Sequence, residues 1–544
     1  MGTAMSKRKY KTRISSGSTV QGSDIIKLTL ALFFTAFVFF PLARMFLYMD
    51  WESLQSVLSS ANLKTAIGNS LVSAILSTFI TMVIAYVIAY YMERSRLIGR
   101  NLFGILFVLP MLIPSISHGM GIVLLFGNNG LLTRLFGADF HIYGLPGIVV
   151  GSVLYSFPIA YLMLSDVMRY EDSSPYEAAR VLGIDRLHQF TAITLPYLRK
   201  PIISIIFAVF SVIITDYGVP LMVGGTYTTI PVIMYQEVIG RLNFSTGVSY
   251  GCFLLIPAII AFVLDLLNRD GGNTSFVSKP FAPLDNPIGK VIGYCLFLLV
   301  GLFVLLPVVS FVLLGFAHNY PTDMSFTFAN IAKAFNLKLG RYLGHSVTIA
   351  LFVSFIGICI AFVNAYVTAR MKTKATRFLY LAAVTSAAIP GLVLGLSYVL
   401  TFKNTPIYGT LLMLIIVNTV HFFSSPYLMM YNSLLKLNEN LEGVGYTLGI
   451  SRWLMIRDVI IPQCRQTLWE MFSYFFVNCM MTISAVSFLA TTATKPASLM
   501  ITQFEAQMQL ECAAIVSLCI LIINLLIKAI AHYFKKHSVL SRHI

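Results

Sequence analysis

The chain has 544 residues, of which 57% are hydrophobic and only 11% are charged, and its mean hydropathy is +0.80. Because about 25% of the residues in a soluble domain are charged, this composition excludes an ordinary soluble protein and indicates an integral membrane protein. The net charge of +16 would suit a nucleic-acid-binding protein, but the distribution of the basic residues argues against that function.

The apolar segments, taken in chain order, predict twelve membrane-spanning helices of about 20 residues or more each. The first segment does not resemble a cleavable signal peptide, because its apolar run is long and no small-residue cleavage site follows it. The predicted spans are 25–48, 65–92, 101–126, 144–167, 201–224, 249–268, 289–316, 343–369, 378–402, 408–432, 467–490 and 513–534.

Lys and Arg gather in alternate loops between these spans. If the N-terminus lies in the cytoplasm, most of the 38 Lys and Arg residues face the cytoplasm, including the groups at 7–13, 94–100, 370–377 and 535–536. This is the positive-inside bias that orients membrane proteins, and it favours contact with anionic lipid headgroups. It predicts that both termini are cytoplasmic, and it indicates no nucleic-acid partner.

A polar segment between the fourth and fifth spans, residues 172–200, has the features of a short helix, a turn and a second helix. Ser174-Pro175-Tyr176-Glu177 predicts a capping box with proline at N1, and Gly183 predicts a left-handed turn. Ala178 and Ala179 keep one face of the first helix thin, so that another protein surface can close over it. Asp185 can cap the second helix. The segment reads Glu177-Ala178-Ala179-Arg180-Val181-Leu182-Gly183-Ile184-Asp185-Arg186 and continues to Leu195-Pro196.

A second polar segment, residues 437–466, repeats this pattern at an offset of 266, counted from Gly183 to Gly449. Both copies carry Leu-Gly-Ile-x-Arg, and both have a proline thirteen residues after the glycine. The second copy has Gly443-Val444-Gly445 in place of Glu-Ala-Ala and lacks a capping box, although Asn440 is available as a cap. We therefore expect a weaker first helix there. The segment reads Glu442-Gly443-Val444-Gly445-Tyr446-Thr447-Leu448-Gly449-Ile450-Ser451-Arg452 and continues to Ile461-Pro462.

Both segments resemble the "EAA" coupling loop of the membrane subunits of bacterial ABC importers, and two copies in one chain resemble a fused permease dimer. The resemblance implies the all-α fold of a type I importer, with about twelve transmembrane helices in two parallel six-helix repeats. It also implies a location in the bacterial cytoplasmic (inner) membrane. Its partners would be two copies of an ABC ATPase on the cytoplasmic side and an external substrate-binding protein. The residues it assigns to ATPase coupling are Glu177, Ala178, Ala179, Gly183, Asp185, Glu442, Gly443, Gly449 and Ser451.

The duplication extends well beyond these two loops. Residues 65–71 match 341–347 at an offset of 276, and at the same offset Arg94 matches Arg370. After the third span of each repeat the offset falls to 266, because the second repeat has a shorter outer loop. Since each repeat has an even number of spans, the repeats are parallel rather than inverted. The predicted divisions are a basic tail (1–24), a first half (25–268) with the first coupling loop (172–200), a cytoplasmic linker (269–288), a second half (289–534) with the second coupling loop (437–466), and a basic tail (535–544).

Motifs for ATP hydrolysis and for metal binding are not recognisable. The sequence has no GxxxxGK[ST] loop, so we predict that this chain is not an enzyme and binds no cofactor, and that ATP and Mg²⁺ are used by the partner subunits. The nine histidines form no HExxH or HxxxH pattern and the seven cysteines no CxxC pair. We therefore predict no metal site, and we interpret the cysteines as buried, unpaired thiols.

Five polar residues are candidates for a translocation pathway between the halves: Asp216, Tyr217, Ser484, Asn69 and His345. Asp216 lies well inside a span, and intramembrane acids are functional candidates; the alternative is that it caps a helix break before Gly218. Asn69 and His345 occupy equivalent positions in the two repeats. Helix capping or an interhelix polar contact is the simpler interpretation of both.

The sequence thus predicts the permease of an ABC importer for a small solute. The segments around Asp216, at 235–245 and at 482–489 resemble fused permeases for ferric iron or 2-aminoethylphosphonate, and thiamine and polyamine permeases are more distantly similar. The alternative is a twelve-span, ion-coupled secondary transporter, a class that is also built from parallel six-span repeats. That class needs intramembrane carboxylates, and besides Asp216 the spans offer only acids at their ends, such as Asp166, Asp265 and Glu470.

Overall fold

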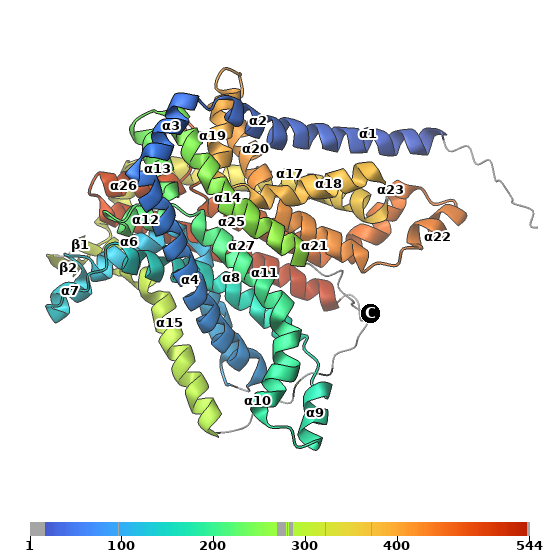
Figure 1. The fold of residues 1–544 in the computed structure, drawn as a ribbon, viewed down its shortest axis with the longest axis horizontal. Coiled ribbons are helices and arrows are strands. Elements are labelled where there is room, and N and C mark those ends of the chain that lie inside the picture. The colour runs from blue at the N-terminus through green and yellow to red at the C-terminus, as the bar shows by residue number, and fades with distance from the viewer. Residues whose placement is uncertain are drawn as a thin grey trace, which may run out of the picture.

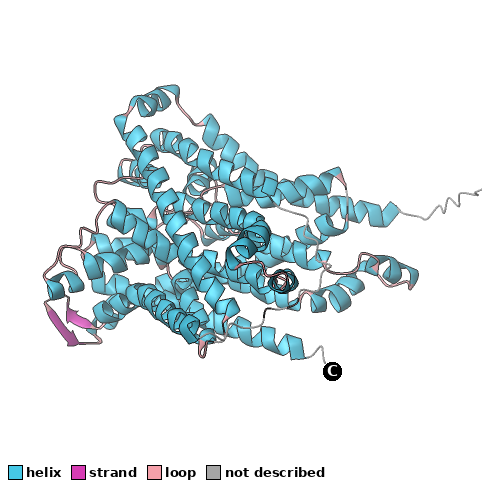
Figure 2. Ribbon diagram, turned by 60° about the horizontal axis from the view of Figure 1, so that its bottom comes forward, coloured by secondary structure: helices cyan, strands magenta, loops and turns pink. Residues whose placement is uncertain are grey.

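The computed structural model describes residues 17–95, 97–268, 279, 281, 287–320, 322–371 and 373–540, with side chains between residues 24 and 535. The tail before residue 17, most of the predicted linker and residues 541–544 lie outside this description. Within it the regular structure is helical except for one antiparallel hairpin (Figure 2). The predicted all-α class is therefore confirmed.

The first half contains its elements in the order expected for six spans with a polar loop before the fifth. They are α1 (Gly17–Phe34), η1 (Thr35–Phe39), α2 (Phe40–Leu47), α3 (Trp51–Ser59), α4 (Ala61–Arg94), α5 (Arg100–Val108), η2 (Leu109–Leu112), α6 (Ser115–Phe126), α7 (Leu131–Phe136), α8 (Leu145–Arg169), α9 (Ser174–Val181), α10 (Arg186–Gln189), η3 (Phe190–Thr194), α11 (Leu195–Ile214), α12 (Gly218–Val223), α13 (Ile230–Tyr235), η4 (Gln236–Gly240) and α14 (Phe244–Asn268).

The second half repeats this order and adds the hairpin after its first span. Its elements are α15 (Pro287–Gly315), β1 (Ala317–Asn319), β2 (Asp323–Phe326), α16 (Ala329–Asn336), α17 (Leu339–Arg370), α18 (Lys374–Thr385), η5 (Ser386–Ala388), α19 (Gly391–Phe402), α20 (Leu411–His421), α21 (Ser424–Leu435), α22 (Leu441–Thr447), α23 (Arg452–Met455), η6 (Ile456–Ile460), α24 (Ile461–Gln463), α25 (Arg465–Met481), α26 (Ser498–Ala506) and α27 (Leu510–Leu540).

Not all of the predicted spans are single straight helices. In the described residues, eight helices are long and apolar enough to cross a membrane, or up to eleven if each of three bent pairs counts as one span. The spans predicted at 101–126 and 378–402 are bent by 101° and 108°, and the one at 408–432 by 53°. The cause of the two sharp bends is Pro114 and Pro390, which stand immediately before α6 and α19. Proline removes a backbone donor and disfavours helical dihedrals in the residue before it.

The fifth span of each half ends earlier than predicted. The segment predicted at 201–224 ends as a helix at Ile214, and the one predicted at 467–490 ends at Met481. The apolar run continues past both ends because the following residues are buried against other helices, so apolarity alone does not mark where the helix stops. In the first half the chain then forms α12, whereas in the second half residues 484–489 form turns.

The first span of each half packs against the broken third span of the other half. In one direction α15 lies against α5 and α6, and a Cβ on Gly121 would come within 2.9 Å of Pro307. In the other direction α2 lies against α19, where the Tyr398 hydroxyl donates to the carbonyl of Phe37 at 2.6 Å. This exchange of spans holds the two halves together.

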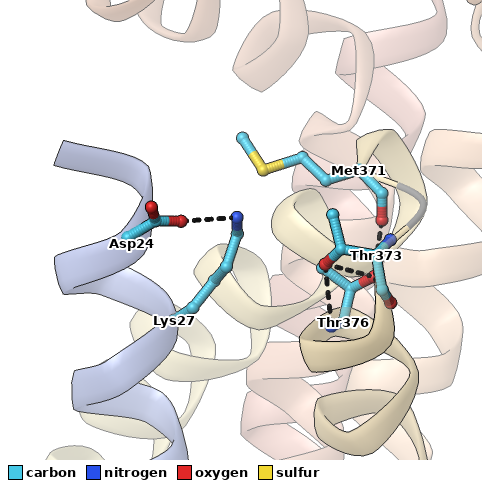
Figure 3. A network of polar contacts seen from close by, with 5 residues as sticks. All are labelled: Asp24, Lys27, Met371, Thr373 and Thr376. Atoms are coloured by element: carbon cyan, nitrogen blue, oxygen red, sulfur yellow. Dashed lines mark hydrogen bonds and ion pairs between the residues drawn. The ribbon is translucent and has the colours of Figure 1, made fainter. Parts of the chain in front are cut away.

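The first span of the first half also contacts the second half where α1 packs against α18. Figure 3 shows the Lys27–Asp24 ion pair of α1, at 2.9 Å, beside the beginning of α18. There Thr373 and Thr376 form a capping box, and the Thr376 hydroxyl donates to the carbonyl of Met371. The capping box fixes the first turn of α18 and so its position against α1.

The elements of the coupling loops and those of the opposite face lie at different ends of the molecule. In Figure 1, α9 and α10 lie at the bottom and α22 and α23 at the right, whereas α7, α26 and the hairpin lie at the left. The described ends of α1 and α27 lie on the side of α22 and α23. The described ends of the chain are thus on the side of the coupling loops, which agrees with an even number of spans in each half.

Candidate functional site

The first coupling loop has the predicted helix, turn and helix. Gly183 follows α9 at φ +69°, the left-handed region that favours glycine. The N–H of Ile184 donates to the carbonyl of Ala179 at 2.9 Å, which closes the end of α9. Asp185 begins α10 as predicted, because its carboxylate accepts a hydrogen bond from the N–H of Leu187 at 3.2 Å. A hydrogen bond from His188 lowers the pKa of Asp185.

The predicted capping box at Ser174 and Glu177 is wrong. Ser173 is the residue before α9, and it already has helical dihedrals and makes no capping bond. The cap comes instead from Asp172, whose carboxylate accepts hydrogen bonds from the N–H of Ser174 at 3.0 Å and from its hydroxyl at 2.8 Å. Glu177 is thereby left to bind the ammonium of Lys279 at 2.7 Å, and this contact lowers the pKa of Glu177.

The second coupling loop has the same backbone as the first in spite of its different sequence. Gly449 also has φ +69°, and the N–H of Ile450 donates to the carbonyl of Gly445 at 2.9 Å. The Ser451 hydroxyl caps α23 by accepting from the N–H of Leu454 at 3.3 Å. Asn440, which was available as a cap for α22, makes no side-chain capping bond. A turn of this shape, rather than the Glu-Ala-Ala letters, is what the two loops share.

Each loop buries a small residue at one shared position and exposes another small residue at a position that is not shared. Ala179 and its equivalent Gly445 are buried inside their loops, so Ala179 cannot contribute to an outer docking face. Ala178 and Gly443 are exposed. Large apolar side chains beside them are exposed as well: Val181, Leu182, Val444, Tyr446 and Leu448. Exposed apolar residues gathered on short polar loops are typical of a protein interaction site.

An arginine at the end of a long span holds each loop, and sequence reasoning did not assign this role. Arg94, at the end of α4, forms a buried ion pair with Glu171, which also accepts a hydrogen bond from the Tyr176 hydroxyl. Arg370, at the end of α17, forms an ion pair with Glu442 at 3.1 Å. The signal was present in the sequence, since Arg94 and Arg370 match in the repeat.

Asp216 lies at the break after α11 and caps α12. Its carboxylate accepts hydrogen bonds from the N–H of Gly218 at 3.2 Å and of Val219 at 3.0 Å, and Ser115 also bonds to it. Of the two interpretations left open by the sequence, the structure therefore supports capping of a helix break. A water-sized cavity of about 10 Å³ adjoins the carboxylate.

Tyr217 joins the two halves where this helix break faces the second half. Its hydroxyl bonds to the Ser487 hydroxyl at 2.6 Å, and its side chain is fully buried. Its ring stacks on Tyr235 with the centroids 4.9 Å apart, and Tyr235 in turn stacks on Phe488 at 6.2 Å. Three aromatic rings from both halves thus fill the space between α12 and the turns after α25.

Ser484 occupies the position equivalent to Gly218, and Gly391 occupies the position equivalent to Ser115. The serine and the glycine of each contacting pair are therefore exchanged between the two halves. In the first half Gly218 faces Ser115, to whose hydroxyl a Cβ on Gly218 would come within 2.4 Å. In the second half Ser484 faces Gly391, and a Cβ on Gly391 would come within 2.1 Å of the Ser484 hydroxyl. Each pair has room for one side chain only, which keeps the break close to the beginning of α6 or α19.

Asn69 and His345 have equivalent structural contacts within their own halves. The Asn69 amide donates to the carbonyl of Thr228 at 2.9 Å, and the His345 ring lies 3.3 Å from the carbonyl of Lys495. Both side chains thus bond to a loop carbonyl of their own half, rather than capping a helix or joining two helices. Among the described residues, no group of three or more His, Cys, Asp and Glu could hold a metal ion.

This arrangement defines a membrane permease made of two homologous halves, each with one loop at the same end of the molecule. Comparison with known proteins identifies the family, because the binding-protein-dependent transport system inner membrane component family matches residues 82–269 and again residues 357–538. The chain belongs to this family. The two matches confirm the duplication, and membership sets aside the ion-coupled secondary transporter.

Several permeases are similar to this chain over much of their length. The chain is 24% identical over 519 residues to the putative ferric transport system permease protein FbpB 1 of Haemophilus influenzae, covering 89% of this chain and 80% of that protein. It is 26% identical over 521 residues to the ferric transport system permease protein FbpB of Actinobacillus pleuropneumoniae, covering 90% and 74%. The thiamine transport system permease protein ThiP of Haemophilus influenzae is 23% identical over 378 residues, 65% and 66%.

Family membership fixes the general role and location of the chain. It is a component of the inner membrane and serves a transport system that depends on a binding protein. A permease of this family works with an ATPase and with a substrate-binding protein, so both are its partners.

Proposed function

We propose that this chain is a fused permease that forms the membrane pathway of an ATP-driven importer. The observation that carries the proposal is the pair of coupling loops, which have different sequences but the same backbone, with Gly183 and Gly449 both at φ +69°. A shape that is kept in both halves while its residues change is the expected result of binding the same kind of partner twice.

Two ATPase subunits would bind, one at each coupling loop. In the second loop a groove of about 300 Å³ is lined by α22 and α23, including Glu442, Gly443 and Tyr446. In the first loop the exposed positions are Ala178, Val181 and Leu182. ATP and Mg²⁺ would be bound by these partners, and this chain would hold no cofactor and no resident metal.

The side with the coupling loops would be cytoplasmic. Two observations support this orientation: the described ends of α1 and α27 lie on that side (Figure 1), and so do the basic residues Arg94 and Arg370, which pair with acids at the coupling loops. The binding protein would then dock at the opposite face, where α7, α26 and the hairpin lie. The basic groups would contact anionic lipid headgroups.

The substrate we propose is ferric iron, because relatives that align over 89% and 90% of this chain are ferric transport permeases. The resemblance of individual segments leaves 2-aminoethylphosphonate as a second candidate, with thiamine or a polyamine behind it. Ferric iron would pass between the halves near Tyr217 and Ser484. Asp216, already engaged by two backbone N–H groups and by Ser115, would influence the passage by its charge.

ATP-driven closure of the two ATPases would move the coupling loops toward each other. Arg94 and Arg370 join each loop to the end of a long span, so a displacement of the loop would be transmitted to α4 and α17. The exchanged first spans would keep the halves in contact while they rock between inward-open and outward-open states.

Co-purification and uptake together test this function. The tagged chain is expressed with the ATPase of its transport system, and binding of the ATPase is measured beside uptake of radioactive ferric iron in the presence of the binding protein. We expect the ATPase to co-purify and ATP to be required for uptake. Failure of the ATPase to bind would reject the importer, whereas ATPase binding without iron uptake would reject only the substrate.

A further inference from the structure

Two residues of the chain between the halves lie against the first coupling loop. Lys279 contacts the segment before α9 with its backbone in both directions: its N–H donates to the Asp172 carboxylate at 3.2 Å, and its carbonyl accepts from the N–H of Ser173 at 3.0 Å. Its ammonium binds Glu177 at 2.7 Å. Lys279 therefore contacts both the cap and the first turn of α9.

Phe281 covers the ion pair behind this helix. The Arg94 guanidinium lies over its ring, 3.2 Å from the centroid, and the ring of Tyr176 lies edge-on at 5.0 Å. Arg94 is also paired with Glu171, which accepts from the Tyr176 hydroxyl. Phe281 thus completes an apolar cover over charges that are otherwise costly to bury.

The second coupling loop has no counterpart to these contacts in the described residues, and its sequence explains why. At the position of Glu177 it has Gly443, which has no side chain for a lysine to bind, and at the position of Tyr176 it has Glu442. Arg370 is paired directly with Glu442, and it also donates to the carbonyls of Leu437 and Asn438 at 3.4 Å. The second loop is therefore held by its own arginine.

We propose that Lys279 and Phe281 are positioning residues of the first coupling loop, and that together with α9 they form a composite docking surface for one ATPase. The two ATPase sites of this permease are then unequal: one includes Lys279 and Phe281, and the other consists of the second loop and its groove. The inference rests on the proposed function for the identity of the partner. The contact within the chain stands independently of it.

Proximity is tested first, on the full chain without partners. In a background without the seven native cysteines, the double variant Glu177→Cys, Lys279→Cys is treated with a short bifunctional thiol cross-linker that spans the length of the Lys279–Glu177 ion pair, and the linked peptide pair is sought by mass spectrometry. We expect the link to form. The matched control is Gly443→Cys, Lys279→Cys, which places a thiol at the equivalent position of the second loop and is expected to give no link. Absence of the first link, or equal yields of the two, would overturn the proposal whatever the function of the chain.

Coupling is tested next, in the assembled complex. We expect Phe281→Ala to lower the ratio of solute transported to ATP hydrolysed by about fivefold. This factor corresponds to the free energy of one cation–π contact. Lys279→Ala is expected to have a smaller effect, because Lys279 is half-exposed and its backbone contacts remain. Lys436→Ala, at an exposed lysine just before the second loop, is the control and leaves the ratio unchanged. An unchanged ratio in Phe281→Ala, with a normal amount of complex, would contradict the proposal. Failure of every variant and of the parent to bind an ATPase would instead reject the proposed function.

Discussion

At the scale of single residues, equivalent positions in the two halves keep a geometry rather than an amino acid. The turn after α9 and the turn after α22 both need a left-handed residue, and glycine is retained at both. The cap of the following helix is Asp185 in one loop and Ser451 in the other, since either side chain accepts a backbone hydrogen bond. Close packing at the breaks needs one glycine in each contacting pair. It is Gly218, at the break, in the pair with Ser115, and Gly391, at the beginning of α19, in the pair with Ser484.

A first prediction concerns the two turn glycines. A Cβ on Gly183 or Gly449 would have open space around it, so valine there is opposed by backbone conformation and not by a clash. Because that conformation costs an L-residue about 1–2 kcal/mol, we expect the Gly183→Val, Gly449→Val double variant to lose about tenfold in ATPase binding and uptake, while the spans stay folded. Gly137→Val is the control, since Gly137 has φ +60° and open space in the loop after α7, away from the coupling loops. Normal coupling in the double variant would show that the turns do not present the docking helices.

A second prediction concerns the hydrogen bond between Tyr217 and Ser487. Tyr217→Phe keeps the aromatic stack and removes the hydroxyl, and the Ser487 hydroxyl still bonds to the carbonyl of Ile483. If this contact keeps the halves together away from the coupling loops, its loss raises ATPase activity in the absence of the binding protein. In a double-mutant cycle with Ser487→Ala, measured on this ATPase activity, we expect a coupling energy between the two positions of about 1 kcal/mol. Strictly additive effects would show that the bond does not join the halves during the cycle.

At the scale of elements, the two coupling loops are anchored to the spans by ion pairs of different burial. The Glu171 side chain is 5% exposed beside Arg94, whereas the Glu442 side chain is 23% exposed beside Arg370. Removal of one partner from a buried pair leaves a charge without compensation, and the cost rises with burial. The first loop therefore depends more strongly on its arginine than the second.

This difference gives a third prediction. We expect Arg94→Met to destabilise the purified chain by about 3–5 kcal/mol, measured by thermal unfolding in detergent, and Arg370→Met to destabilise it less, because water reaches Glu442. Glu171→Gln added to Arg94→Met should restore part of the stability, since it removes the uncompensated charge. An equal loss in the two single variants would mean that the difference in burial has no energetic consequence.

The sequence predicted these elements unevenly, and the reasons are physical. The apolar runs identified the straight spans, such as α4 and α17, because each is one helix with no interruption. The breaks at Pro114 and Pro390 were not predicted as bends, although both prolines were visible, because the runs on either side are equally apolar. The loop glycines and Asp185 were predicted from local backbone rules. The contacts of Lys279 and the pairing of Arg94 depend on residues far apart in the chain, so no local pattern indicated them.

At the scale of the whole molecule, the exchange of first spans makes the two halves interdependent. Since α15 packs on the first half and α2 on the second, neither half buries its broken third span without the other. Fusion into one chain keeps the two halves at a high effective concentration, which favours this pairing over association of separate subunits. The same arrangement brings both described chain ends to the side of the coupling loops.

The last prediction tests the orientation of the whole molecule. Val181, at the end of α9, is 88% exposed, and Asn319, in the hairpin, is also exposed; the two lie at different ends of the molecule. If the coupling loops are cytoplasmic, a membrane-impermeant thiol reagent should label Asn319→Cys in intact cells and should label Val181→Cys only after permeabilisation. The parent chain, with its seven native cysteines, provides the blank for both. Labelling of Val181→Cys in intact cells would place the loops outside, where no ATPase could reach them, and the proposed coupling would have to be abandoned.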